Sequence, residues 1–300
     1  AGGASVCAGG GGGSDAGFVP GGDAMSGPLA AGLDMSLLAG LFGLLIGSFL
    51  NVCISRLPYD ESVVAPRSHC PRCGAWIAWF DNIPLLSYAL LQGRCRACGA
   101  VISWRYPVVE ALTGGLFWLA VTLHGPTLAG LKWSVFAAIL VALIFTDLET
   151  RILPDEFTKA GMVAGFLLAP VAPLPPGLLS IFWPGASPAL ISLLDALAAA
   201  GLLAGGLWLM ALVYERLRGR EGLGFGDVKM LGLLGAFLGL ESALLVMVLA
   251  SLFGSVLGLV WVKVRGEDMG SYELPFGSFL GVAGLVVAFA GVGLFRELGG

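Results

Sequence analysis

Two aspartates in this 300-residue chain stand where long apolar segments meet charged loops. Asp147 ends one such segment, and Asp227 begins another within the glycine-rich stretch from Gly222 to Met230. A carboxylate at the edge of an apolar segment is costly to desolvate, so it needs a partner or a function. A helix that begins near Asp227 stabilises the ionised carboxylate through its N-terminal dipole. We therefore expect Asp147 and Asp227 to act as a pair.

Two carboxylates a few ångströms apart cannot both ionise readily, so one keeps a proton while the other stays charged. The charged carboxylate can take a proton from water, which attacks a peptide carbonyl, while the protonated one donates to the carbonyl oxygen. The two histidines, His69 and His124, are isolated, which argues against a histidine-based site. The pair therefore predicts an aspartic peptidase. Taken alone, Asp147 also fits an interfacial charge.

Charged residues between the two aspartates have simpler interpretations. Asp155 follows Pro154 at the start of an apolar segment, so we expect it to cap the next helix. Glu149 and Arg151 are interpreted as interfacial charges.

Four cysteines form two C-x-x-C knuckles, Cys70–Cys73 and Cys95–Cys98, each followed by a glycine. Each knuckle can present two thiolates from one tight turn, and tetrahedral zinc takes four such ligands. A closed shell of four thiolates leaves no open position, so the predicted zinc is structural. Reduced or disulfide-bonded cysteines are the alternatives, and a cytoplasmic location disfavours disulfides. Neighbouring arginines can offset the charge of the thiolates: Arg72, Arg94 and Arg96.

The composition indicates the kind of scaffold that must position these residues. Hydrophobic residues make up 57% of the chain, charged residues 12%, and the mean hydropathy is +0.90. A soluble domain carries about 25% charged residues. The chain is therefore predicted to be an all-α polytopic membrane protein whose surroundings are the lipid bilayer, with no nucleic-acid partner.

Eight apolar segments are predicted to span the membrane, where a full crossing takes about 20 residues. The sixth is short enough to be a helix inside the bundle or one arm of a hairpin with the seventh. The predicted spans are 35–55, 108–124, 130–147, 159–179, 189–214, 228–241, 243–262 and 276–295.

Basic residues give the orientation, because they concentrate in cytoplasmic loops. With eight spans and an external N-terminus, only Lys132 and Arg296 of the 16 basic residues lie outside. This orientation places Asp147, Asp227 and the cysteine loop on the cytoplasmic side.

Four regions are predicted: a flexible, glycine-rich leader over 1–33, a first transmembrane helix over 34–55, a zinc-stabilised loop domain over 56–107, and a transmembrane peptidase domain over 108–300. Cys53 is expected to pack in the first span, and Cys7 in the leader is given no role.

The chain resembles the type IV prepilin peptidase family over nearly all of its length after Asp34. The resemblance includes both cysteine knuckles and the segments around the two aspartates. Its further motifs are Gly47-Ser48-Phe49-Leu50-Asn51-Val52, Arg56-Leu57-Pro58, Asp81-Asn82-Ile83-Pro84, Gly93-Arg94-Cys95-Arg96, Arg105-Tyr106-Pro107-Val108-Val109-Glu110, Gly224-Phe225-Gly226-Asp227-Val228-Lys229 and Leu274-Pro275-Phe276-Gly277.

The resemblance implies an enzyme of the bacterial inner membrane that cuts the short basic leader from type IV prepilins or type II secretion pseudopilins. It implies that Asp147 and Asp227 are catalytic. It also implies N-methylation of the new N-terminus with S-adenosylmethionine, in a region around Gly93 and Arg94. Two alternatives stay open: a G-x-G-D protease that cuts other substrates within the membrane, and an ion-coupled transporter. A transporter predicts carboxylates near the centre of the bilayer.

Overall fold

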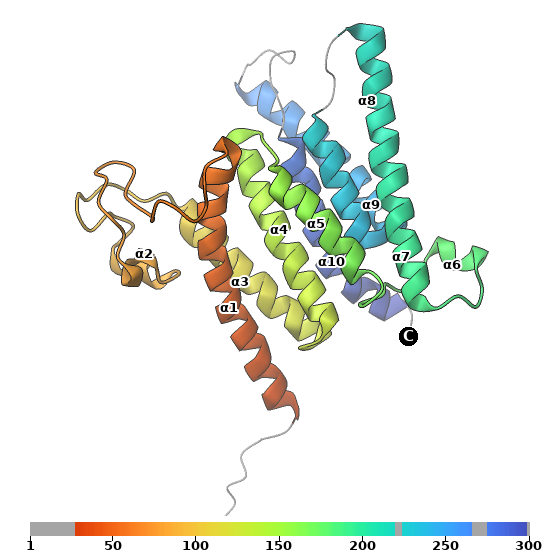
Figure 1. The fold of residues 1–300 in the computed structure, drawn as a ribbon, viewed down its shortest axis with the longest axis horizontal. Coiled ribbons are helices and arrows are strands. Elements are labelled where there is room, and N and C mark those ends of the chain that lie inside the picture. The colour runs from red at the N-terminus through yellow and green to blue at the C-terminus, as the bar shows by residue number, and fades with distance from the viewer. Residues whose placement is uncertain (1–27, 220–223, 266–274, 299–300) are drawn as a thin grey trace, which may run out of the picture.

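The structure is a computed structural model that describes residues 28–219, 224–265 and 275–298 (Figure 1). These residues form helices joined by loops, and no strand occurs among them. The predicted glycine-rich leader lies outside the described residues as far as residue 27. The first helix begins at Pro28, upstream of the predicted start at Asp34. Proline suits a first helical turn because the N–H that it lacks has no partner inside the helix.

Long helices carry most of the described chain. They are α1 (Pro28–Arg56), α3 (Arg105–His124), α4 (Leu128–Thr150), α5 (Asp155–Leu168), α7 (Pro188–Ala199), α8 (Gly205–Arg218), α9 (Phe225–Arg265) and α10 (Phe276–Leu298). A π-helical turn, η3 (Ala200–Ala204), joins α7 to α8 without a break. The short elements are η1 (Leu57–Tyr59), η2 (Trp79–Asn82), α2 (Leu86–Leu90) and α6 (Leu178–Phe182).

Among the described residues, five stretches of helix are long and apolar enough to cross a membrane, which confirms the predicted all-α membrane protein. They are Met35–Tyr59, Arg105–His124, Leu128–Thr150, Pro188–Arg218 and Phe225–Val260. The count of eight spans stays a prediction. One reason is α5, which has 14 residues and is therefore about 21 Å long, shorter than a hydrocarbon core of about 30 Å.

Helix α9 contains both the sixth and the seventh predicted spans, and it is broken at Gly239, two residues before the predicted end of the sixth span. At Gly239 the backbone takes φ 75° and ψ 179°, a conformation open in practice only to glycine. Gly226, before the break, packs on Leu153, and Gly254, after it, faces Phe276 at the start of α10. Because Leu153 also touches the start of α10, the two arms of α9 form a hairpin, which was one of the two expectations for this segment.

Helix α4 lies at the centre of the bundle, where it packs against α9 and α10. Phe136 and Phe237 have ring centroids 4.9 Å apart within this core. A Cβ at Gly281 of α10 would lie 2.4 Å from the side chain of Ile144, so only glycine allows so close an approach. Small residues let helices pack closely in lipid, where the hydrophobic effect contributes little to helix association. The packing therefore fixes the ends of α4, α9 and α10 relative to one another.

Candidate active site and metal centre

Asp147 lies in the last turn of α4, where its side chain is buried. Its Oδ2 accepts hydrogen bonds from the backbone N–H of Ser278, at 2.6 Å, and from the Ser278 hydroxyl, at 2.7 Å. The same hydroxyl lies 3.2 Å from the carbonyl oxygen of Ile144. It can donate to the ionised carboxylate, or donate to the carbonyl when Asp147 carries the proton. Ser278 therefore suits both protonation states of Asp147. No role was predicted for Ser278, although it directly follows the Leu274–Gly277 motif.

Asp227 lies in the first turn of α9, half-buried, and its N–H donates to the carbonyl of Gly224 at 3.1 Å. Leu153 packs between the starts of α9 and α10. A Cβ at Gly226 would lie 3.2 Å from Leu153, and one at Gly277 would lie 3.0 Å from Leu153 and 3.1 Å from Cγ of Asp147. This packing brings Asp227 close enough to Asp147 for a direct electrostatic interaction. The structure thus brings the two predicted residues together at one end of the bundle.

Lys229 links the start of α9 to the start of α5 through an ion pair. Its ammonium forms an ion pair with Asp155, whose other carboxylate oxygen lies 2.7 Å from Nζ of Lys159. The N-cap of α5 is Pro154. The expected capping role of Asp155 is therefore wrong, because its carboxylate is engaged by the two lysines.

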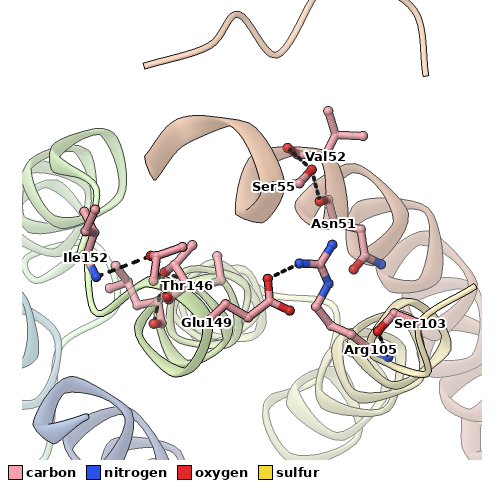
Figure 2. Close-up of polar contacts among 11 residues, drawn as sticks. Asn51, Val52, Ser55, Ser103, Arg105, Thr146, Glu149 and Ile152 are labelled. Carbon is pink, nitrogen blue, oxygen red and sulfur yellow. Dashed lines mark hydrogen bonds and ion pairs between the residues drawn. The ribbon is translucent and has the colours of Figure 1, made fainter. Parts of the chain in front are cut away.

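A second polar cluster joins α1, α3 and α4 beside Asp147. The buried guanidinium of Arg105 forms an ion pair with Glu149, and Figure 2 shows these two side chains pointing toward one another from α3 and α4. Asn51 of α1 donates to the carbonyl of Tyr106 at 3.1 Å. Within the described part of the chain, Nε of Arg105 and Oδ1 of Asn51 are buried without a partner. Glu149 is thus more than the interfacial charge that we expected.

The four cysteines meet in the loop between α1 and α3. Their sulfur atoms all lie within 4.8 Å of one another, and Sγ of Cys70 is 3.9 Å from Sγ of Cys98. A tetrahedron of thiolates about 2.3 Å from zinc has sulfur–sulfur edges of roughly 3.8 Å. Gly74 and Gly99 have φ values of +72° and +69° and donate to the first cysteine of their knuckles, at 2.9 and 2.8 Å. This donor set fits a tetrahedral metal ion.

Electrostatics differ among these sulfurs. Backbone N–H groups of Cys73 and Arg72 lower the pKa of Cys70 to about 6, which favours its thiolate. An N–H bond from Ala100 acts in the same direction at Cys98, but desolvation and the other three sulfurs outweigh it and raise the pKa of Cys98 to about 11. Several thiolates this close repel one another, so a bound cation stabilises the full set.

The surroundings of the knuckles also explain two other residues. Gly93 is buried at φ +66°, and a Cβ there would lie 3.0 Å from the ring of Tyr88, which gives this glycine a packing role. Arg94 is exposed. Arg96 binds the carboxylate of Asp81 at 2.6 Å and lowers the pKa of that carboxyl.

Two stretches of the chain match models of known protein families. Residues 41–124 match a model described as the bacterial peptidase A24 N-terminal domain, and this stretch of the chain contains the four cysteines. Residues 134–259 match the type IV leader peptidase family, and this region contains both Asp147 and Asp227.

Curated relatives carry the name prepilin leader peptidase/N-methyltransferase. One from Myxococcus xanthus is 42% identical over 76% of this chain, and the match spans 63% of that protein. One from Burkholderia pseudomallei is 35% identical over 92% of this chain and 94% of its own length. One from Aeromonas hydrophila is 39% identical over 85% of this chain and 91% of its own length. No solved structure matches the chain.

Proposed function

Because this chain belongs to the type IV leader peptidase family, we propose that it is a membrane-bound aspartic peptidase that removes the leader from prepilins and methylates the new N-terminus. The observation that carries the proposal is the meeting of Asp147 and Asp227 at the same end of the helix bundle. The substrates are prepilins or related pseudopilins, as the names of the relatives suggest.

The proposed chemistry is attack by water on the peptide carbonyl. One carboxylate accepts a proton from the water molecule, whose oxygen bonds to the carbonyl carbon. The other aspartic acid donates its proton to the carbonyl oxygen. Collapse of the tetrahedral intermediate breaks the C–N bond, and the departing amine takes a proton. Ser278 supports either role of Asp147, because its hydroxyl can donate to the charged carboxylate or to Ile144 instead.

The proposed reaction takes place at the cytoplasmic face of the bacterial inner membrane. Arg56, Arg105 and Arg151 lie at the helix ends on the side of the two aspartates, and cytoplasmic ends are rich in basic residues. An ion-coupled transporter would place its acidic residues near the bilayer centre, whereas both aspartates occupy helix ends. The geometry therefore favours a peptidase.

The proposed metal is a structural zinc ion held by Cys70, Cys73, Cys95 and Cys98. When bound, it would offset two of the four thiolate charges and join the two knuckles. Metal binding supplies folding free energy in small loop domains that have little apolar core. All four coordination positions are then taken by sulfur, so the residues of this cluster take no part in leader cleavage.

Methyl transfer is proposed for the same loop, in the region of Gly93 and Arg94. S-adenosylmethionine, the proposed donor, supplies a methyl group bound to a sulfonium. The new N-terminal amine would accept that methyl group as the S–C bond breaks, with S-adenosylhomocysteine leaving and the amine's proton passing to water.

A cleavage assay with a purified prepilin tests the proposal. Asp147→Asn and Asp227→Asn should each abolish leader removal while the protein accumulates normally, because neither amide can replace the acid or the base. Asp60→Asn is a matched control: Asp60 is exposed with φ +55°, a conformation that asparagine also tolerates. Full cleavage by either active-site variant would exclude the pair.

Methylation is measured separately. The cleaved product is incubated with labelled S-adenosylmethionine, and its N-terminus is analysed by mass spectrometry. We expect one methyl group on the new N-terminal amine. A product that is cleaved but carries no label would retain the peptidase and remove the second activity.

A further inference from the structure

The segment from Trp79 to Leu90, which we call the η2–α2 segment, exposes an unusual number of large apolar side chains. Trp79 and Leu90 are 76% and 74% exposed, and three other apolar side chains between them are also exposed: Phe80, Ile83 and Leu86. A water-facing loop rarely presents so many large apolar groups together, and such patches mark protein or membrane contacts.

The η2–α2 segment carries almost no free charge. Its single acidic residue is Asp81, whose carboxylate is bound by Arg96 at 2.6 and 2.9 Å. The side chain of Asp81 is only 10% exposed. Pairing lowers the cost of placing a carboxylate near lipid. The segment therefore meets its surroundings with aromatic and aliphatic groups.

Contacts with α1 and α3 fix the depth of the segment. The N–H of Leu85 donates to Glu110 at 2.8 Å, and Glu110 also bonds Ser48. Glu110 lies five residues inside α3, and Ser48 lies eight residues before the end of α1. At a rise of 1.5 Å per residue, these positions lie about 7 and about 12 Å below the helix ends. Figure 1 likewise shows α2 beside α1 and α3 rather than beyond their ends.

The neighbouring surface is already that of a membrane helix. Along α1 the exposed side chains of Leu41, Leu45 and Phe49 follow one another at intervals of four residues. Arg67 and Arg72 of the same loop are exposed, and arginines of this kind attract anionic headgroups. An apolar, aromatic segment that continues this surface just below the helix ends matches the membrane interface, where tryptophan concentrates.

We propose that the η2–α2 segment is an interfacial anchor that inserts Trp79, Leu86 and Leu90 into the leaflet on the side of Asp147 and Asp227. The four-cysteine cluster and Gly93 are thereby held in the headgroup region rather than in free solution. The anchor depends on lipid alone, so it holds whether or not the peptidase proposal does.

Fluorine NMR on the full chain tests this proposal. The protein is labelled with 5-fluorotryptophan and placed in nanodiscs of phosphatidylcholine and phosphatidylglycerol, and each of its 8 tryptophans is assigned by substitution with phenylalanine. One sample contains lipid with a nitroxide near the top of the acyl chain, and the other a water-soluble gadolinium chelate. We expect the lipid nitroxide to broaden Trp79 as strongly as Trp118, which is 40% exposed on α3, and the chelate to leave Trp79 sharp.

A buried tryptophan and a pair of matched variants serve as controls. Trp133, only 7% exposed in the core, should respond to neither probe. The double variant Leu86→Asn/Leu90→Asn should reduce the lipid-induced broadening of Trp79 at least several-fold, whereas Val64→Asn, at a still more exposed site outside the segment, should not. Broadening of Trp79 by the chelate alone would overturn the anchor. Protection of Trp79 only after addition of a prepilin would also overturn it, in favour of a protein contact.

Discussion

At Asp147 the chemistry of a single carboxylate depends on a residue 131 positions away. Ser278 gives that carboxylate two hydrogen bonds, one from its backbone and one from its hydroxyl. The backbone bond persists whatever the side chain, so substitution of Ser278 isolates the contribution of the hydroxyl. Asp227 receives no comparable side-chain bond among the described residues, which makes the two carboxylates unequal. Repulsion between the two charges makes such a pair hold one proton, and unequal surroundings decide which carboxylate keeps it.

Ser278→Ala is expected to lower the rate of leader cleavage roughly 10- to 100-fold. A hydrogen bond to a charged group contributes about 1.5–3 kcal/mol, which is roughly that factor in rate. The loss should lie in kcat rather than KM. The acid limb of the pH–rate profile should also shift, because the hydroxyl donates to the carboxylate only when Asp147 is ionised. Ser251→Ala is the control, since that hydroxyl bonds only Met247 of its own helix. A variant with an unchanged profile would limit Ser278 to a packing role.

Among the helices, the hairpin in α9 decides where Asp227 lies. The turn at Gly239 sits at the opposite end of the bundle from the active site, against α7, where Asp195 accepts from the N–H of Leu240 at 3.3 Å. A Cβ at Gly239 would lie 2.1 Å from that carboxylate. The position therefore needs glycine both for its backbone conformation and for space.

Gly239→Ala is expected to destabilise the protein by about 1–3 kcal/mol from backbone strain alone. The clash with Asp195 adds to this cost. Thermal unfolding in detergent measures the effect. Gly115→Ala is the matched control, because a Cβ at Gly115 meets no atom within 4 Å and the residue lies inside α3. That control should be neutral or slightly stabilising. Equal melting temperatures for both variants would contradict a strained turn at Gly239.

The ion pair between Arg105 and Glu149 joins α3 to α4 two residues beyond Asp147. Its two partners are unequally covered: the Arg105 side chain is 9% exposed and that of Glu149 is 41% exposed. Removing the charge of Glu149 leaves a buried guanidinium uncompensated, which costs more than the loss of the bond itself.

Glu149→Gln is expected to lower the unfolding free energy by about 1–2 kcal/mol, less than for a fully buried pair because solvent screens Glu149. Melting temperature in detergent is the measurement. Glu156→Gln, at an exposed position in the first turn of α5, is the control and should change little. A stability loss confined to the control would show that the pair does not hold α3 to α4.

For the molecule as a whole, the loop with the four cysteines is the part whose folding depends least on an apolar core. Its knuckles are fixed by two turns and two isolated bridges, His69 with Trp76 and Arg94 with Val101. Most of its large apolar side chains are exposed. Its order is therefore expected to depend on a bound metal ion and on contacts with the helices.

The purified protein is expected to contain about one zinc ion per chain, held by four sulfur ligands. Elemental analysis should find the metal lost in Cys70→Ser/Cys73→Ser and retained in Cys53→Ala, because Cys53 is buried in α1 away from the cluster. Proteolysis of the loop should become faster when a chelator removes the metal. Full metal content in the double variant would show that the ion binds elsewhere.

The spacing of residues along the sequence predicted the fold class, the cysteine cluster and the pair of aspartates. The length and composition of the apolar segments predicted a helical membrane protein. The C-x-x-C spacing predicted the cysteine cluster, and the positions of Asp147 and Asp227 at segment ends predicted a pair. These features depend on residues that are close in sequence or that stand at the same end of the predicted spans. Ser278 beside Asp147, Arg105 beside Glu149 and the turn at Gly239 were decided only by the tertiary structure. Each depends on how helices far apart in sequence pack, and no local pattern records which side chains packing brings into contact.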